Sequence, residues 1–141
     1  MKIGFTGTQK GMTPEQRRTF EGFVDPNEGT DFMAEFKPEF HSGDCVGADE
    51  QARDICEYHG YRLIGHPPDN PSKRAFGAFH EIREPLPYLD RNKAIVNETD
   101  YLIACPGEMQ EKLRSGTWST VRYARKQGRK VVIIYPNGEI G

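Results

Sequence analysis

Residues 114–120, RSGTWST, followed by VRYARKQGRKVVIIYP at 121–136, place a turn, a helix and an apolar strand in succession. Small residues and hydroxyls lie where the loop should become a helix, which leaves backbone N–H groups unpaired at the positive helix end. Such an end can receive an anion such as phosphate. Serine and threonine also cap helices that bind nothing, so an ordinary helix cap is the alternative interpretation.

Two further strand-to-helix junctions carry glycines. Residues 2–6, KIGFT, predict a strand that runs into a turn at Gly7, and TPEQ at 13–16 predicts a helix with a capping box. That helix should turn Phe20, Phe23 and Val24 inward. Residues 40–49, FHSGDCVGAD, form a second junction before the helical pattern EQARDICEYHG. A cap alone does not need two glycines that permit close backbone approach.

The middle of the chain predicts a third strand over residues 61–66 and a helix capped by Asp90. Between them, residues 69–89 are rich in proline and too long for a casual connection, which favours a functional loop. Arg91 would lie in the first turn of the helix, where a cation is unfavourable without an anion nearby. A bound phosphate explains that choice, and a salt bridge to Glu84 or Asp90 is the alternative.

The alternation of strands and helices predicts the fold class. Residues 101–105, YLIAC, are the kind of apolar run that parallel sheets bury on both faces. We therefore expect one α/β domain over residues 1–141: a Rossmann-like, doubly wound, mainly parallel sheet with helices on both faces. Ligands of such sheets bind at the carboxyl ends of the strands, where the three junctions should meet.

Composition excludes several classes of protein. The 141 residues are 35% apolar with a mean hydropathy of −0.74, and neither a membrane span nor a signal-peptide pattern follows Met1, which predicts a cytoplasmic protein. Three cysteines with no CxxC pair predict free thiols and no metal site. A net charge of −2 argues against a surface built wholly for nucleic acid.

Four blocks in this order, IGFTGT, FHSGDCVGADEQA, LDRNKAIVNETDYLIACP and RSGTWSTVRYARKQGRKVVIIYP, resemble the SLOG superfamily. This superfamily has a Rossmann-like fold and includes the DNA-processing protein DprA (Smf) and the LOG proteins, once described as lysine decarboxylases. The resemblance covers most of the chain except residues 25–38 and the loop after Pro68. It implies a nucleotide or nucleotide-derived ligand and a bacterial or phage origin.

The resemblance also implies a set of site residues. Phosphate would be held by the turn at 115–117, beside an arginine–asparagine pair and the second glycine loop. The expected ligand-binding residues are Gly7, Thr8, Gln9, Ser42, Gly43, Asp44, Gly47, Asp49, His66, Arg91, Asn92, Pro106, Arg114, Ser115, Gly116, Thr117 and Trp118. His66 has a second possible role, as a catalytic base.

LOG enzymes cleave nucleoside monophosphates with a glutamate in a PGGxGTxxE pattern. Thr120 stands at the position of that glutamate, and Leu113-Arg114-Ser115 replaces the paired glycines. The resemblance therefore favours a stand-alone binding or sensor module, in which Trp118 or Tyr88 stacks a base.

Two other functions stay open. An N-glycosidic hydrolase or transferase would need a carboxylate near the ribose, for which Asp44, Asp49 and Glu108 are the candidates. A weaker alternative is DprA-like binding of single-stranded DNA through Lys10, Arg91, Arg114 and Arg122. We expect no required cofactor, no membrane partner and a homodimer, since proteins of this kind commonly pair.

Overall fold

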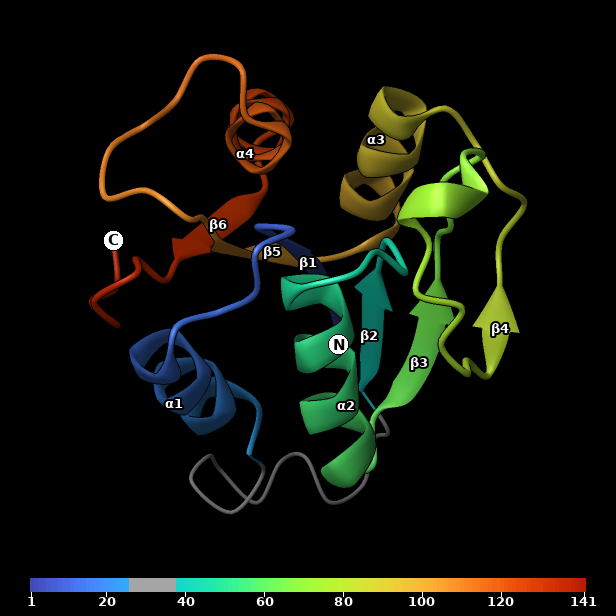
Figure 1. Cartoon of the computed structure of the whole chain (residues 1–141), viewed down its shortest axis with the longest axis horizontal. Coiled ribbons are helices and arrows are strands. Elements are labelled where there is room, and N and C mark those ends of the chain that lie inside the picture. The colour runs from blue at the N-terminus through green and yellow to red at the C-terminus, as the bar shows by residue number, and fades with distance from the viewer. Residues whose placement is uncertain (26–37) are drawn as a thin grey trace.

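The computed structural model describes residues 1–25 and 38–141, which form one sheet with helices on both faces (Figure 1). Residues 26–37, within the stretch 25–38 where the sequence predicts a loop with a short helical piece, lie outside the described residues. The elements in chain order are β1 (Lys2–Gly7), α1 (Pro14–Val24), β2 (Glu39–Ser42), α2 (Ala48–Tyr58), β3 (Arg62–Gly65), the 3-10 helix η2 (Pro71–Lys73), β4 (Glu81–Ile82), α3 (Tyr88–Glu98), β5 (Tyr101–Cys105), α4 (Gly116–Lys126) and β6 (Lys130–Ile133).

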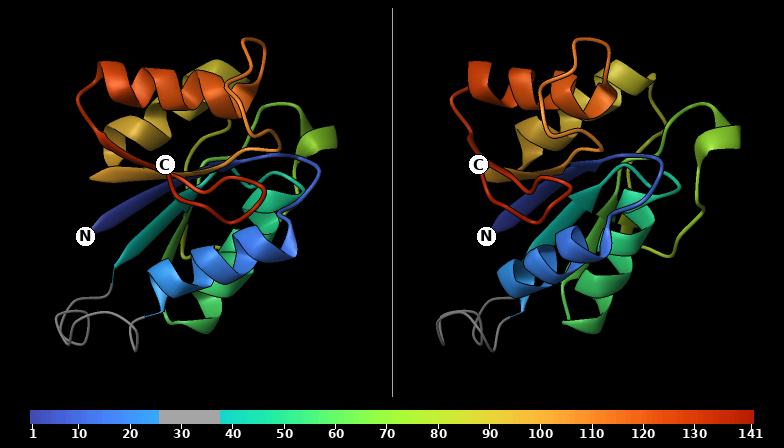
Figure 2. Two further views of the ribbon diagram at one scale, coloured as in Figure 1. Left: turned by 90° about the vertical axis from the view of Figure 1, so that its left-hand side faces the viewer. Right: turned by 60° about the vertical axis from the view of Figure 1, so that its left-hand side comes forward.

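All six described strands are parallel, in the order β4-β3-β2-β1-β5-β6. The helices α1 and α2 cover one face of the sheet, and α3 and α4 cover the other (Figure 2). The chain builds outward from β1 through β4, then returns to the other side of β1 for β5 and β6. This order confirms the predicted Rossmann-like fold and places the topological switch point between β1 and β5, where ligands of such sheets bind.

Aromatic side chains fill the core between the sheet and the α1–α2 layer. The rings of Phe5, Phe20 and Phe40 are fully buried, with centroids 5.4 to 6.2 Å apart. Each such pair adds about 0.5–1.5 kcal/mol beyond the burial of its area. A second apolar cluster lies between the sheet and α4 and includes Trp118 and Val121. The two layers of core hold β1 and β5 rigidly, and the ends of these strands position the site.

The start of α1 is the one the sequence predicts. Thr13 accepts a hydrogen bond from the Gln16 N–H, and the Gln16 side chain accepts one from the Thr13 N–H, which completes the capping box. Phe20 and Val24 are buried as expected. The prediction for Phe23 is wrong, because this side chain is 39% exposed and lies off the inward stripe of the helix.

The start of α3 corrects the sequence analysis. The helix begins at Tyr88 with Pro87 as its N-cap residue, so Asp90 is in the first turn and does not cap it. The N–H of Arg91 donates to the Pro87 carbonyl at 2.9 Å, which puts Arg91 one turn inside the helix and facing inward. Proline ends the preceding extended chain and is compatible with a helix start. At this position the signal from Pro87 outweighs the N-cap signal from Asp90.

The three cysteines are free and buried, as the sequence predicts. None of the helices in the described ranges is long and apolar enough to cross a bilayer.

Candidate functional site

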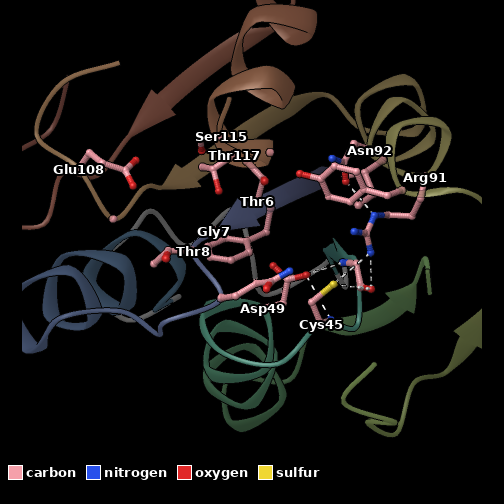
Figure 3. A pocket seen from close by; sticks show the side chains of 17 residues that line it. Thr6, Gly7, Thr8, Cys45, Asp49, Arg91, Asn92, Glu108, Ser115 and Thr117 are labelled. Atoms are coloured by element: carbon pink, nitrogen blue, oxygen red, sulfur yellow. Dashed lines mark hydrogen bonds between the residues drawn. The ribbon is translucent and has the colours of Figure 1, made fainter. Parts of the chain in front are cut away.

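A cavity of about 150 Å³ lies at the switch point, where the carboxyl end of β1 and the loops after β2 and β5 meet the first turns of α3 and α4 (Figure 3). It brings together ten of the residues that the sequence predicts as ligand-binding: Gly7, Thr8, Gln9, Gly43, Asp49, Arg91, Asn92, Ser115, Gly116 and Thr117. All three glycine-bearing junctions therefore contribute to one cavity.

The first turn of α4 forms one wall of the cavity. Ser115 is the N-cap residue, and its hydroxyl accepts from the Trp118 N–H at 3.3 Å. The N–H groups of Gly116 and Thr117 have no partner among the residues that the structure describes. Two donors at the positive end of the helix are thus available to a ligand.

Tyr88 restricts this same turn. A Cβ atom on Gly116 would collide with the Tyr88 hydroxyl, so a larger residue at 116 would displace the tyrosine. The Tyr88 ring is 43% exposed and lies over Arg91, with the guanidinium carbon 5.7 Å from the ring centroid. Tyr88 is therefore accessible from the cavity, and its stacking on a base stays a prediction.

Arg91 forms the opposite wall and is only 4% exposed. Its Nη1 donates to the carbonyls of Gly43 at 2.6 Å and His66 at 3.3 Å, and its Nε donates to Asn92 Oδ1 at 2.8 Å. No carboxylate forms an ion pair with it among the described residues, so the alternative of a salt bridge to Glu84 or Asp90 is not realised. A buried positive charge without an ion-pair partner faces the cavity.

Asp49 lies on the cavity floor at the start of α2. Its Oδ2 accepts from the N–H groups of Gly43 at 3.1 Å and Cys45 at 3.4 Å, while Oδ1 has no donor among the described residues. Burial raises the pKa of this carboxyl to about 6, against the opposing pull of Arg91 and of the two N–H groups. Burial and the nearby Asp49 also raise the pKa of the Cys45 thiol.

The paired glycines of the second junction have packing reasons. Gly47 has a φ of +91°, and a Cβ there would collide with the Gln9 carbonyl. A Cβ on Gly43 would collide with Arg91 and Asp49. Because these glycines have no side chains, two loops and the buried guanidinium of Arg91 can pack closely around the cavity. A simple helix cap would not require this.

Seven predicted residues do not line the cavity: Ser42, Asp44, Gly47, His66, Pro106, Arg114 and Trp118. The expectation that Trp118 stacks a base is wrong, because its ring is 2% exposed and packs 6.4 Å from Tyr135. Its Nε1 donates to Glu108 at 3.0 Å, and Glu108 does line the cavity. The carboxylate of Asp44 instead pairs with Arg74 at 2.8 Å and accepts from the Gly77 N–H at 2.9 Å.

His66 belongs to a separate buried network. Its Nε2 lies 2.9 Å from Nδ1 of His41, whose Nε2 lies 2.9 Å from Glu39. Burial lowers the pKa of His66 to about 4, so the ring is neutral at pH 7. A neutral, fully packed imidazole outside the cavity is poorly placed to act on a ligand there.

The same network is the one group in the described ranges whose ligand atoms could meet at a metal ion. The donor atoms of His41, His66 and Glu98 lie within 4.8 Å of one another. The two imidazoles already bind each other, and Arg83 forms an ion pair with Glu98 at 2.9 Å. Arg83 binds Oε1 of Glu98, and Oε2 of Glu98 lies 3.8 Å from Nδ1 of His66.

The sequence analysis missed several cavity residues. Thr6, Cys45 and Gly107 line the cavity but were not predicted as ligand-binding. Their positions carried a signal: Thr6 directly precedes Gly7 at the end of a strand, Cys45 lies between the two glycines of the second junction, and Gly107 follows the apolar strand at 101–105.

The cations predicted to bind DNA do not act as one exposed group. Arg91 is buried, and Arg122 pairs with Glu111 and donates to the Leu113 carbonyl, each at 2.9 Å. Only Lys10 and Arg114 of the four remain without such side-chain contacts among the described residues. Two separate cations make a weak surface for a phosphate backbone.

Comparison with known proteins supports the fold. No family model and no curated protein matches this chain. The molybdenum cofactor binding protein from the phototrophic bacterium Rippkaea orientalis superposes with a TM-score of 0.70 at 23% identity, over 95% of this chain and 76% of that one. The X-ray structure of TM1055 superposes with a TM-score of 0.64 at 17% identity, over 92% and 71%. At these identities the likeness concerns the Rossmann-like fold alone.

Proposed function

We propose that this chain is a binding or sensor module for a nucleotide or nucleotide-derived ligand whose phosphate binds at the first turn of α4. The observation that carries the proposal is the pair of free N–H groups of Gly116 and Thr117, which open into a cavity at the switch point. The buried charge of Arg91 on the opposite wall adds attraction for an anion. The resemblance to the SLOG superfamily and the likeness to the molybdenum cofactor binding protein of Rippkaea orientalis point the same way.

A charge reversal at the cap tests the phosphate position. Aspartate is as good an N-cap as serine, so Ser115→Asp keeps the helix start but adds a negative charge where the phosphate would bind. The measurement is a thermal-shift panel of AMP, ADP, NAD and ADP-ribose, followed by calorimetry. We expect at least one nucleotide to raise the unfolding temperature, and Ser115→Asp to weaken its binding by about tenfold or more.

Thr13→Asp is the matched control, because it makes the same kind of change at the N-cap of α1. That helix end is outside the cavity, so nucleotide affinity should not change. Equal losses in both variants, or no thermal shift with any nucleotide, would overturn the proposal.

A second candidate function, hydrolysis of an N-glycosidic bond, is favoured by one observation. Asp49 is a buried carboxyl with a pKa of about 6 and a free oxygen on the cavity floor, the properties of a group that can stabilise or exchange charge near pH 7. Thr120 cannot replace the glutamate of the LOG pattern, since its hydroxyl is buried and donates to the Gly116 carbonyl.

Incubation with nucleoside monophosphates and chromatography for free base separates the two functions. As a module, the protein releases no base above the uncatalysed rate. Rapid release that is lost in Asp49→Asn or Glu108→Gln would instead establish the hydrolase.

A further inference from the structure

A second cavity adjoins the one at the switch point. This distal chamber has a volume of about 300 Å³ and shares Gln9, Cys45, Tyr88 and Arg91 with the near chamber of about 150 Å³. Its remaining walls come from residues 68–73, at the start of the long loop that follows β3. Tyr88 and Arg91 therefore stand at the boundary between the two chambers.

The volumes show that the near chamber is too small on its own. Sites for small organic ligands usually measure about 300–1,000 Å³. The near chamber is half the lower limit, whereas the two chambers together fall inside the range. A phosphate bound at the first turn of α4 fits the near chamber, and the rest of a nucleotide-sized ligand must extend past Tyr88.

The distal chamber is held in place by specific contacts. The Lys73 carbonyl accepts from the Val46 N–H at 3.3 Å, and the Asp44 carbonyl accepts from the Ala75 N–H at 2.8 Å. The Asp44 side chain binds Arg74, and its backbone adopts a φ of +52°, unusual for a residue with a side chain. These bonds fix the loop against the second glycine junction, so the chamber exists before a ligand arrives.

The chemistry of the distal walls suits a flat ring better than a second phosphate. Pro68 and the half-exposed ring of Tyr88 supply apolar surface. Of its ionisable side chains, Lys73 and Asp69 have opposite charges, so apart from Arg91 at the boundary the chamber has no net charge to attract an anion. The Asp69 carboxylate and the Asn70 amide nitrogen offer polar atoms for the edge of a heteroaromatic ring, whereas Oδ1 of Asn70 already accepts from the Ser72 N–H and hydroxyl.

We propose that the distal chamber receives the heteroaromatic ring of the phosphorylated ligand, and that residues 68–73 are its recognition loop. The ligand class is a purine nucleotide or another heteroaromatic phosphate ester, with the phosphate at α4 and the ring against Tyr88 and Pro68. This inference rests on the proposed function, because it takes the phosphate position as its starting point. It gives the long loop after Pro68 a role.

Calorimetry with ribose 5-phosphate, AMP and GMP tests the inference on the full chain. Ribose 5-phosphate reports the near chamber alone, whereas the nucleotides add a ring. Lys73→Trp fills the distal chamber, since no described residue pairs with the Lys73 side chain and the new indole can occupy the space. Lys126→Trp is the matched control on the exposed end of α4, and the unfolding temperature of each variant verifies its folding.

In the native protein, at least one of the two nucleotides should bind about tenfold or more tightly than ribose 5-phosphate, the effect of one base–aromatic contact. Lys73→Trp should remove that advantage and leave ribose 5-phosphate binding unchanged, and Lys126→Trp should change neither. If ribose 5-phosphate and both nucleotides bind equally, or Lys73→Trp leaves nucleotide binding intact, the inference is overturned while the proposed function stands. If none of the three ligands binds, this inference is overturned, and the thermal-shift panel with ADP, NAD and ADP-ribose decides the proposed function separately.

Discussion

The helices α1 and α4 both start at a hydroxyl-bearing N-cap residue, but the hydrogen bonds around the two N-termini differ. At α1, Thr13 and Gln16 complete a capping box, and the Gln16 amide donates to the carbonyls of Pro106 and Ile134 at 2.7 and 2.9 Å. The Thr13 hydroxyl also donates to the Pro136 carbonyl at 2.6 Å. At α4, the Ser115 hydroxyl accepts from the Trp118 N–H, and the N–H groups of Gly116 and Thr117 face the cavity.

The difference shows what distinguishes a structural helix end from a candidate site. Both ends carry the positive side of a helix dipole. At α1, Pro14 has no N–H, the Gln16 N–H bonds the Thr13 hydroxyl, and the fully buried Gln16 side chain donates to two carbonyls of the chain. At α4, glycine at the first helical position leaves room for the Tyr88 hydroxyl beside the turn, and no described residue accepts a hydrogen bond from the two free donors. The closed end stabilises the fold, and the open end leaves two backbone donors unpaired beside the cavity.

The largest expected effect comes from breaking the closed end. Gln16→Ala removes both amide donors from two buried carbonyls and half of the capping box, so we expect the free energy of unfolding to fall by roughly 3–5 kcal/mol. Urea unfolding followed by circular dichroism measures it. Gln127→Ala, an exposed glutamine after α4, is the control and should change stability by less than about 0.5 kcal/mol. Equal effects would show that the closed end contributes little.

The cavity beside the open end can be examined through the pH dependence of stability. The folded-state pKa of Asp49, about 6, lies above its ordinary value of 3.8, so the folded protein binds the extra proton between these values. Asp49 therefore makes the free energy of unfolding fall as pH rises from about 4 to 6. His66 acts in the opposite sense, because its pKa falls from 6.5 to about 4 on folding. The stability that the neutral ring contributes is therefore lost as pH falls through this range.

Asp49→Asn removes one of these two opposing contributions. The variant's free energy of unfolding should rise with pH between 4 and 6.5 more steeply than that of the native protein, by at most roughly 3 kcal/mol over the range. Urea unfolding at several pH values measures the two slopes. Parallel curves would mean that burial at the cavity floor does not raise the pKa of this carboxyl.

The smallest effect compares the two caps directly. Thr13→Ala should lower the free energy of unfolding by about 1–2 kcal/mol, since it loses the cap and the bond to the Pro136 carbonyl. Ser115→Ala should cost about 0.5–1 kcal/mol, because only one longer hydrogen bond is lost. Chemical denaturation of both variants gives the ranking. A larger loss for Ser115→Ala would remove the contrast between the closed and open ends.

Much of the fold and part of the candidate site follow from local pattern. The apolar run at 101–105 and the glycine-bearing junctions correctly predict a parallel α/β sheet and the meeting of three junctions at its carboxyl edge. The start of α3 is mispredicted because proline and aspartate both signal a helix start, and local sequence does not rank them. Seven of the predicted residues lie outside the cavity for reasons of packing that local pattern does not show: Trp118 and His66, for example, are buried in the core, and Asp44 pairs with Arg74.

The sequence by itself determined most of the elements, their order and the three glycine-bearing junctions, because caps, periodicity and glycine positions act within a few residues. It did not predict β4 or the start of α3. Only the tertiary structure decided that Thr13 begins a closed end and Ser115 an open one. Closure depends on Gln16 reaching carbonyls 90 and 118 residues away in the chain, whereas the opening depends on Tyr88 and Arg91 arriving from another helix. Contacts at such separations are fixed by the packing of the sheet and its helices, which no local pattern encodes.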